Sequence, residues 1–283
     1  MAFTGNRKTL LTPVTVQAFP VKRTDLSRMI GQMSGATTSI GSVAKAARIL
    51  RAFASSEPEF TVRALAERTG IPRSTCHALC TTLLRHRLLD TSPTGRYRLG
   101  PALVGLGGQV IARTGLVEAT AGYLEDLARR TRCEVHVGQL VEGWIVYLAR
   151  VPRRRNPAMN NLVGLRVPAF QTGCGKAALS RLPDPTVKRL VDEVVEETRT
   201  SPPDVEHLLH VLADARAAGF VVNREYQRGR VSVAAPLVTP YREHVVGGIS
   251  VATLEDQLRP EHIPEIAEAV RETAARISER VRA

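Results

Sequence analysis

Three helical patterns and one strand–turn–strand pattern follow one another in residues 40–100. In each helical stretch apolar residues recur every three or four positions, which is typical of a helix with one buried face. Two short β-patterns then flank a turn that contains Pro93 and Gly95. The predicted elements are helices at about 42–54, 62–69 and 73–85, and strands at about 88–90 and 96–99. This order predicts a winged helix-turn-helix, whose third helix enters the major groove of DNA.

Residues 101–283 alternate predicted helices and strands, which indicates an α+β domain with a largely antiparallel sheet and helices packed on it. The two most regular strands meet at Glu142 and Gly143, as the arms of a hairpin do. Strands are predicted at 134–141, 144–151, 167–170, 220–223, 230–238 and 244–252. Helices are predicted to begin at Pro101 and to span 116–130, 175–181, 185–197, 205–218 and 260–281.

Positive charge is concentrated in the first third of the chain. The whole chain has a net charge of +12, and residues 1–100 hold 15 Lys and Arg against 5 Asp and Glu. Residues 101–283 are close to neutral. Since phosphate backbones are bound mainly by neutralising their charge, the pattern indicates a nucleic-acid reader joined to a second functional domain. We expect a flexible basic N-terminal extension at 1–39, a winged domain at 40–100, a linker helix at 101–115 and a second domain at 116–283.

The amino-acid composition bears on whether the chain folds, on membrane association and on the redox compartment. Hydrophobic residues make up 43% of the 283 residues, enough for packed cores. There is no run of about 18 apolar residues, so no membrane partner is expected. Four cysteines without a CxxC pair are too few for a disulfide scaffold in a chain of this length. We therefore expect a reduced, cytoplasmic compartment.

The third predicted helix carries polar side chains at its amino end, where exposed N–H groups favour phosphate and side chains reach bases. Basic residues near the second helix and in the wing are expected to contact phosphates. The predicted base or phosphate contacts on the third helix are Arg73, Ser74, Thr75, His77 and Thr81, and the predicted phosphate contacts elsewhere are Arg63, Arg96 and Arg98.

A series of motifs in fixed order resembles the IclR family of bacterial transcription regulators, from residue 41 to about 280. The motifs are LAERTGIPRST at 65–75, RYRLGP at 96–101, VGLRVP at 163–168, TGCGKA at 172–177, AAGF at 217–220, Glu225 with Gly229, and SVAAP at 232–236. The chain departs from the family at Ala78, where relatives commonly have Arg, and at Ser232, where many have Cys.

The resemblance implies a winged-helix DNA reader, a connecting helix and a GAF-like effector-binding domain. It implies double-stranded DNA with a palindromic operator as one partner, and a homodimer or dimer of dimers as the assembly. It further implies a small-molecule effector, typically a carboxylate or aromatic acid, bound where backbone N–H groups begin a helix. The residues implied for this site are Met159, Val167, Thr172, Gly173, Cys174, Ser232 and Ser250.

A nucleotide site, a zinc site and a cysteine enzyme are the alternatives to a transcription regulator. A P-loop fails because Phe170 stands where the first Gly is needed and Ala177 where Ser or Thr is needed, so no nucleotide cofactor is expected. The Cys76 and Cys80 pair lacks further zinc ligands at a known spacing, so no metal is expected. The remaining alternative is an enzyme that uses Cys174 as nucleophile, which would need His136 or His244 as its base.

Overall fold

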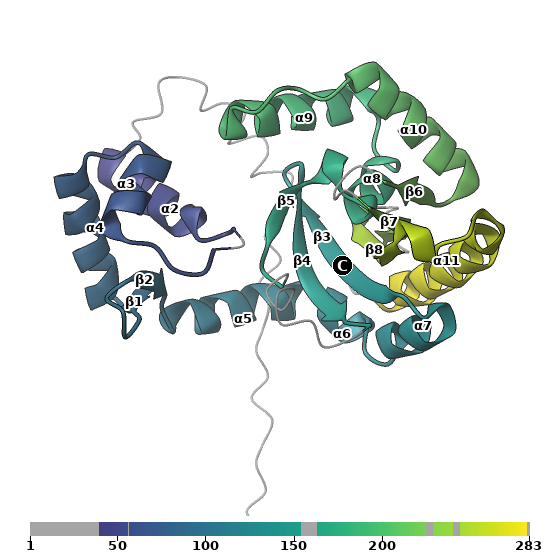
Figure 1. Ribbon diagram of the computed structural model, residues 1–283, viewed down its shortest axis with the longest axis horizontal. Helices are drawn as coiled ribbons and strands as arrows, with labels where there is room; N and C mark the ends of the chain where they lie inside the picture. The colour runs from purple at the N-terminus through teal and green to yellow at the C-terminus, as the bar shows by residue number, and fades with distance from the viewer. Residues whose placement is uncertain (1–39, 56, 154–162, 225–228, 240–243, 282–283) are drawn as a thin grey trace, which may run out of the picture. The chain divides into compact units, whose positions relative to one another are not determined.

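The computed structural model describes residues 40–55, 57–153, 163–224, 229–239 and 244–281, which form a helical N-terminal part and a larger part built on a sheet (Figure 1). The predicted extension 1–39 lies outside these described residues. In the described part of the chain, no helix is both long and apolar enough to cross a bilayer.

The N-terminal part is a winged helix-turn-helix, as predicted. Its apolar core is formed by residues from every element, among them Ile49, Phe60 and Leu65. Phe60 also pairs with Tyr97 of the wing, which ties the start of the second helix to the hairpin. The elements are α2 (Gly41–Ala52), α3 (Val62–Thr69), α4 (Arg73–Arg85), β1 (Leu89–Thr91) and β2 (Tyr97–Leu99).

The turn between α3 and α4 is short because its residues fit their positions. The Thr61 side chain accepts a hydrogen bond from the Ala64 N–H at 3.2 Å and caps α3. Gly70 then ends α3 at φ 66°, a left-handed conformation that costs glycine little. Pro72 directly precedes α4, where a missing N–H loses no helical bond.

The C-terminal part is built on a six-stranded antiparallel sheet in the order β5-β4-β3-β8-β7-β6. The sheet uses two long hairpin-like pairs as its centre, with short strands at the two edges. The strands are β3 (Glu134–Val141), β4 (Trp144–Val151), β5 (Arg166–Pro168), β6 (Val221–Asn223), β7 (Arg230–Val238) and β8 (Val245–Leu254).

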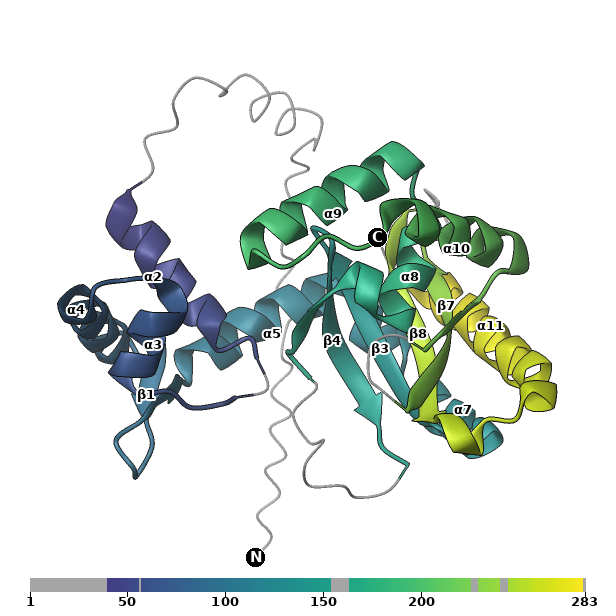
Figure 2. The same ribbon diagram turned by 45° about the horizontal axis from the view of Figure 1, so that its top comes forward.

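Helices cover both faces of this sheet (Figure 2). One face packs against α7 and α11 through an apolar core that includes Val135, Val233 and Ile249. The other face is contacted by α8, which lies on β7 and β8. The helices of this part are α5 (Ala102–Thr114), α6 (Leu116–Ala119), α7 (Tyr123–Thr131), α8 (Gly173–Leu179), α9 (Asp184–Thr198), α10 (Val205–Ala218) and α11 (Ile263–Arg280).

Several predicted boundaries were wrong, among them the following three. The single helix expected at 116–130 is divided into α6 and α7, because Gly122 adopts φ 82° between them. The strand expected at 167–170 ends at Pro168 and continues as a 3-10 turn over Ala169–Gln171. The last helix begins at Ile263, after a separate 3-10 turn over Pro260–His262.

Glycines allow α8 to lie in direct contact with the sheet. A Cβ on Gly248 of β8 would lie 2.3 Å from the carbonyl oxygen of Cys174. A Cβ on Gly175 would lie 2.0 Å from the carbonyl oxygen of Ala169. A side chain on Gly248 would push α8 away from the strand, and a side chain on Gly175 would push α8 away from the 3-10 turn that precedes it. The amino end of α8 is therefore fixed against the polar face of the sheet.

Candidate functional site

The amino end of α4 presents a polar surface. Arg73, Ser74 and His77 are exposed, whereas Cys76 and Cys80 point into the core. The helix has no side-chain cap, so the hydroxyl of Ser74 is not used to close its first turn. Thr75 is half-buried, and Thr81 is exposed but donates its hydroxyl to the carbonyl oxygen of His77 at 3.0 Å. The predicted DNA-reading face is thus on the surface.

The basic residues around α4 differ in how they are held. Arg63 donates to Glu67 at 2.8 Å within α3, and Arg98 donates to Asp90 at 2.7 Å across the wing. In the described part of the chain, Arg73 and Arg96 have no ion pair, although both are exposed. Arg73 and Arg96 can therefore reach a phosphate without breaking an existing contact.

Cys76 and Cys80 belong to the apolar core of the winged domain. Burial raises the pKa of both thiols, and that of Cys80 reaches about 12. Among the described residues, no group of three or more His, Cys, Asp or Glu side chains is placed to hold a metal ion. The two cysteines fill space on the buried face of α4.

The amino end of α8 brings several of the predicted effector-site residues together. Thr172 caps the helix by accepting from the Gly175 N–H at 3.0 Å. The Cys174 Sγ and the Ser250 Oγ lie 3.1 Å apart. Ser232 is also adjacent, because a Cβ on Gly173 would lie 2.5 Å from its Oγ. Three segments distant in sequence, the start of α8, β7 and β8, thus meet here.

Two further residues were predicted for this site. Val167 lies on the edge strand β5 and belongs to the same buried apolar cluster as Cys174. Met159 lies outside the described residues.

The environment of Cys174 does not suit a nucleophile. Burial raises the pKa of its thiol to about 12, and the hydrogen bond with Ser250 lowers it only in part. The thiol faces the backbone carbonyl of His136, while the His136 ring pairs with Glu134 at 2.8 Å. A thiol that stays protonated and has no imidazole on it lacks the activation that covalent catalysis requires.

A pocket of about 480 Å³ is lined by residues of α8 and α10 and of the segments that precede them. Its lining includes Phe170, Lys176 and His207. Lys176 is 3% exposed, so its ammonium group is part of the interior of the protein. This pocket contains none of the residues expected for the effector site.

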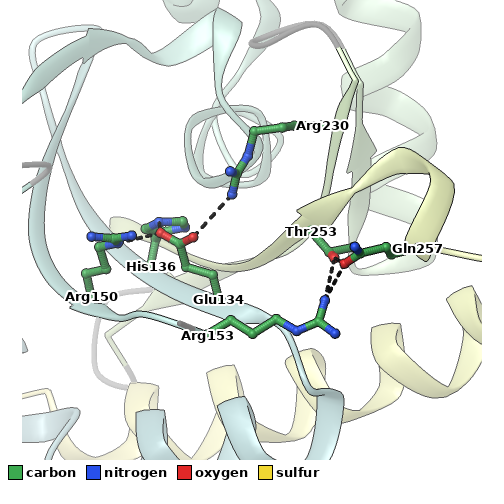
Figure 3. A network of polar contacts seen from close by, with 7 residues as sticks. All are labelled: Glu134, His136, Arg150, Arg153, Arg230, Thr253 and Gln257. Atoms are coloured by element: carbon green, nitrogen blue, oxygen red, sulfur yellow. Dashed lines mark hydrogen bonds and ion pairs between the residues drawn. The ribbon is translucent and has the colours of Figure 1, made fainter. Parts of the chain in front are cut away.

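The sheet face that holds Ser232 and Ser250 also carries an ionic network (Figure 3). The Glu134 carboxylate accepts from His136 at 2.8 Å and from Arg150, and its second oxygen accepts from Arg230 at 3.2 Å. These residues come from β3, β4 and β7. Sequence reasoning missed the network because its members are up to 96 positions apart. The sequence did contain one indication of the network, namely charged residues within otherwise largely apolar strands.

The ionic network holds Glu134 in its charged form. Burial alone would raise the pKa of this carboxyl group, but hydrogen bonds from His136 and Arg150 outweigh burial and lower the pKa to about 2. The His136 ring is further placed by Tyr147, whose ring centroid lies 5.6 Å away. Glu134 is therefore a fixed negative charge that organises two guanidinium groups.

Comparisons with known proteins agree on both parts of the chain. Residues 42–93 match the IclR helix-turn-helix domain, and residues 108–279 match the C-terminal domain of the bacterial transcriptional regulator IclR. The regulator XynR of Escherichia coli is 27% identical over 84% of this chain and 96% of its own length. The regulator TtgV of Pseudomonas putida is 31% identical over 76% of each chain.

Solved structures show the same fold. The IclR regulator of Alicyclobacillus acidocaldarius matches with a TM-score of 0.69 and 26% identity over 85% of this chain and 98% of that chain. An IclR homologue of Microbacterium hydrocarbonoxydans, solved with 4-hydroxybenzoate, matches with a TM-score of 0.65 and 24% identity over 84% and 97%.

A DNA-reading head and a separate sensing domain are the two parts of a one-component transcriptional regulator, in which a bound small molecule alters operator binding. This chain belongs to the IclR family of transcriptional regulators, as its motifs indicated.

The ionic network predicts a loss of stability in acid. Because the pKa of Glu134 is about 2 in the folded protein and 4.5 ordinarily, the unfolded chain binds the proton first as the pH falls. The stabilisation, at most about 3 kcal/mol, is complete above pH 4.5 and is lost as the pH falls from 4.5 towards 2. Urea unfolding at pH 7 and pH 3 should show that Glu134→Gln costs much more stability at pH 7. Glu272→Gln, which removes an exposed ion pair, is the control. An equal cost of Glu134→Gln at both pH values would contradict the prediction.

Proposed function

We propose that this regulator reads a palindromic operator with α4 and lets a small carboxylate acid control that reading from the C-terminal domain. The observation that carries the first half is the exposed amino end of α4, where Arg73, Ser74 and His77 project and no side chain caps the helix. An uncapped helix start offers N–H donors and a positive dipole end to a phosphate. The wing supplies the exposed Arg96 for a second phosphate.

Different side chains of α4 are proposed to make different contacts with DNA. Arg73 carries the charge for a phosphate or a bidentate contact with guanine, and Ser74 and His77 offer hydrogen bonds to base edges. The small side chain of Ala78 is exposed between them, where relatives commonly have Arg. The base preference of this chain therefore rests on a smaller set of contacts than such relatives have.

Replacing Arg73 with Ala should weaken operator binding by about 1–3 kcal/mol, because one charged contact is lost. Arg96→Ala should lower the slope of log affinity against log salt by about one. The measurement is fluorescence anisotropy with the duplex found by footprinting DNA upstream of the protein's own gene. Arg189→Ala removes an equal charge from the exposed face of α9 and should change neither quantity. Unchanged affinity and slope in both DNA-surface variants would contradict the proposed interface.

We infer that two copies of the chain act together, because α5 carries an exposed apolar surface. Val104 is 77% exposed and Val110 is 62% exposed, and Leu106 and Ile111 lie on the same thirteen-residue helix. Apolar residues in such number on one short helix are typical of an interface. A second copy with two-fold symmetry would present two α4 helices to the half-sites of a palindrome.

Charge on this surface should prevent assembly. The double variant Val104→Glu, Val110→Glu should shift the mass in light scattering from a multiple of 30.8 kDa towards 30.8 kDa. The shift follows because a buried carboxylate without a partner is costly. Gln109→Glu adds charge to another exposed position of α5 and should leave the mass unchanged. A double variant that assembles like the wild type would show that α5 is not the interface.

The C-terminal domain is proposed to hold the effector at the polar sheet face, next to Cys174, Ser232 and Ser250. Hydroxyl groups and a thiol that meet below the start of a helix offer hydrogen bonds to a small polar molecule. The homologue solved with 4-hydroxybenzoate motivates the choice of an organic acid as the effector class. We infer no catalytic role for Cys174, whose thiol stays protonated.

A carboxylate that binds this site should raise Tm and change operator affinity, because it binds one state of the domain better than the other. Ser250→Ala should weaken that ligand by roughly tenfold while leaving operator affinity without ligand unchanged. The measurements are thermal shift and anisotropy with 4-hydroxybenzoate, benzoate, pyruvate and succinate. Ser180→Ala, which removes a different buried hydroxyl, at the C-terminal end of α8, is the control. Equal ligand affinity in Ser250→Ala and the wild type would place the site elsewhere.

A further inference from the structure

The ionic network and the proposed effector residues occupy one continuous surface of the sheet. Hydrogen-bonded register aligns Arg150, His136, Ser250 and Ala234 in one row across four strands. The adjacent row contains Glu134 and Ser232, which are both paired with Ala252. The network thus shares β7 with Ser232, through Arg230, and its His136 is paired with Ser250 on the neighbouring strand.

The four side chains of the network are not equally buried. The exposed fractions of the Glu134, His136 and Arg150 side chains are 9%, 8% and 8%, whereas that of Arg230 is 23%. Arg230 is therefore the member that a molecule arriving at this face would meet first. In the described part of the chain, its ion-pair partner is Glu134 alone.

Stability does not explain why charged groups lie on this face. Burying an ion network costs desolvation of each group, and well-packed apolar residues of similar size often stabilise as much or more. The opposite face of the same strands is packed with apolar residues instead, among them Val135, Val231 and Val233. The two arginines and one glutamate also leave an excess of positive charge among the four side chains when His136 is neutral. Such an excess suits a ligand that carries negative charge.

Arg230 has the chemistry to bind a carboxylate. A guanidinium group has five N–H donors in a planar fork, and the contact of Arg230 with Glu134 uses one nitrogen, Nη2, at 3.2 Å. Ser232 lies two residues further along β7 on the same face, at a distance of roughly 7 Å along the strand. A small organic acid could therefore meet Arg230 with its carboxylate and reach the hydroxyl of Ser232 with its other end.

The start of α8 is less able to receive the carboxylate. Its capping position is already filled by the Thr172 hydroxyl, which accepts from the Gly175 N–H. A Cβ on Gly173 would lie 2.5 Å from the Ser232 Oγ, so these two groups are close to contact. The positive side chains of the network lie at the other end of the same surface.

We propose that Arg230 is the residue that binds the carboxylate of the effector, with Glu134 as the positioning residue that holds the guanidinium group towards the site. This inference rests on the proposed effector function and adds the group that recognises the acid. It predicts selectivity for the acid over its amide, because a neutral amide gains no charge-assisted pair with a guanidinium group. A bidentate contact also requires Arg, since Lys offers a single point of charge.

The test compares 4-hydroxybenzoate, benzoate, pyruvate and succinate by calorimetry on the full chain, with 4-hydroxybenzamide and benzamide as neutral analogues. For each acid that binds the wild type, Arg230→Gln should lower affinity by roughly 10- to 100-fold and leave amide affinity within about twofold. Arg230→Lys should recover part of the loss. Glu134→Gln should reduce the preference for acid over amide by less than Arg230→Gln does. Thermal unfolding checks that each variant is folded. If Arg230→Gln does not fold, Arg230→Lys is compared with the wild type in its place.

Arg166→Gln is the matched control. Its side chain is 21% exposed and is paired with Glu197 through two bonds of 2.7 Å, but it lies on the edge strand β5. Acid affinity should not change in this variant. Equal affinity of the wild type and Arg230→Gln for the acids would overturn the assignment of Arg230 while the effector function stands. If no acid binds the wild type, both the assignment and the proposed carboxylate effector are wrong, and the DNA-binding proposal is unaffected.

Discussion

The C-terminal domain depends on a sheet that must bury both of its faces and does so by two different means. Alternation along β3, β7 and β8 sends Val135, Val233 and Ile249 to one side, where α7 and α11 complete an apolar core. The same alternation sends Glu134, Ser232 and Ser250 to the other side. One face can thus stabilise the domain while the other keeps polar groups for a ligand.

The sequence was sufficient wherever a pattern is local. The hairpin of β3 and β4 was predicted with correct ends, because regular alternation stops at Glu142 and Gly143. The break at Gly122 was missed, because the apolar residues of α6 and α7 continue in phase across it. The contact of Arg230 with Glu134 could not be predicted, since it depends on the register of three strands and joins positions 96 apart.

Of the two candidate sites, the DNA-binding surface could be predicted from a local pattern, whereas the effector site could not. The exposed face of α4 follows from helical periodicity, so Arg73 and Ser74 could be placed on the surface from the sequence. The meeting of Cys174 with Ser250 followed only from resemblance, because nothing local relates α8 to β8. Burial also sets the protonation state of Cys174, which no sequence motif indicates. The Cys174 that suggested a nucleophile is a protonated thiol in contact with the hydroxyl group of Ser250.

A buried carboxylate also explains how this domain could respond to an acid. Glu134 is held ionised at neutral pH by its contacts with His136 and Arg150, so it does not take up a proton when a second anion arrives. The arriving carboxylate must share the guanidinium of Arg230 with it, and either the Arg230 side chain or β7 has to adjust. Since β7 also packs on α11 and is adjacent to α8, an adjustment there would reach both faces of the sheet. In the proposed site, the guanidinium group that would recognise the acid is thus carried by a strand that contacts both α8 and α11.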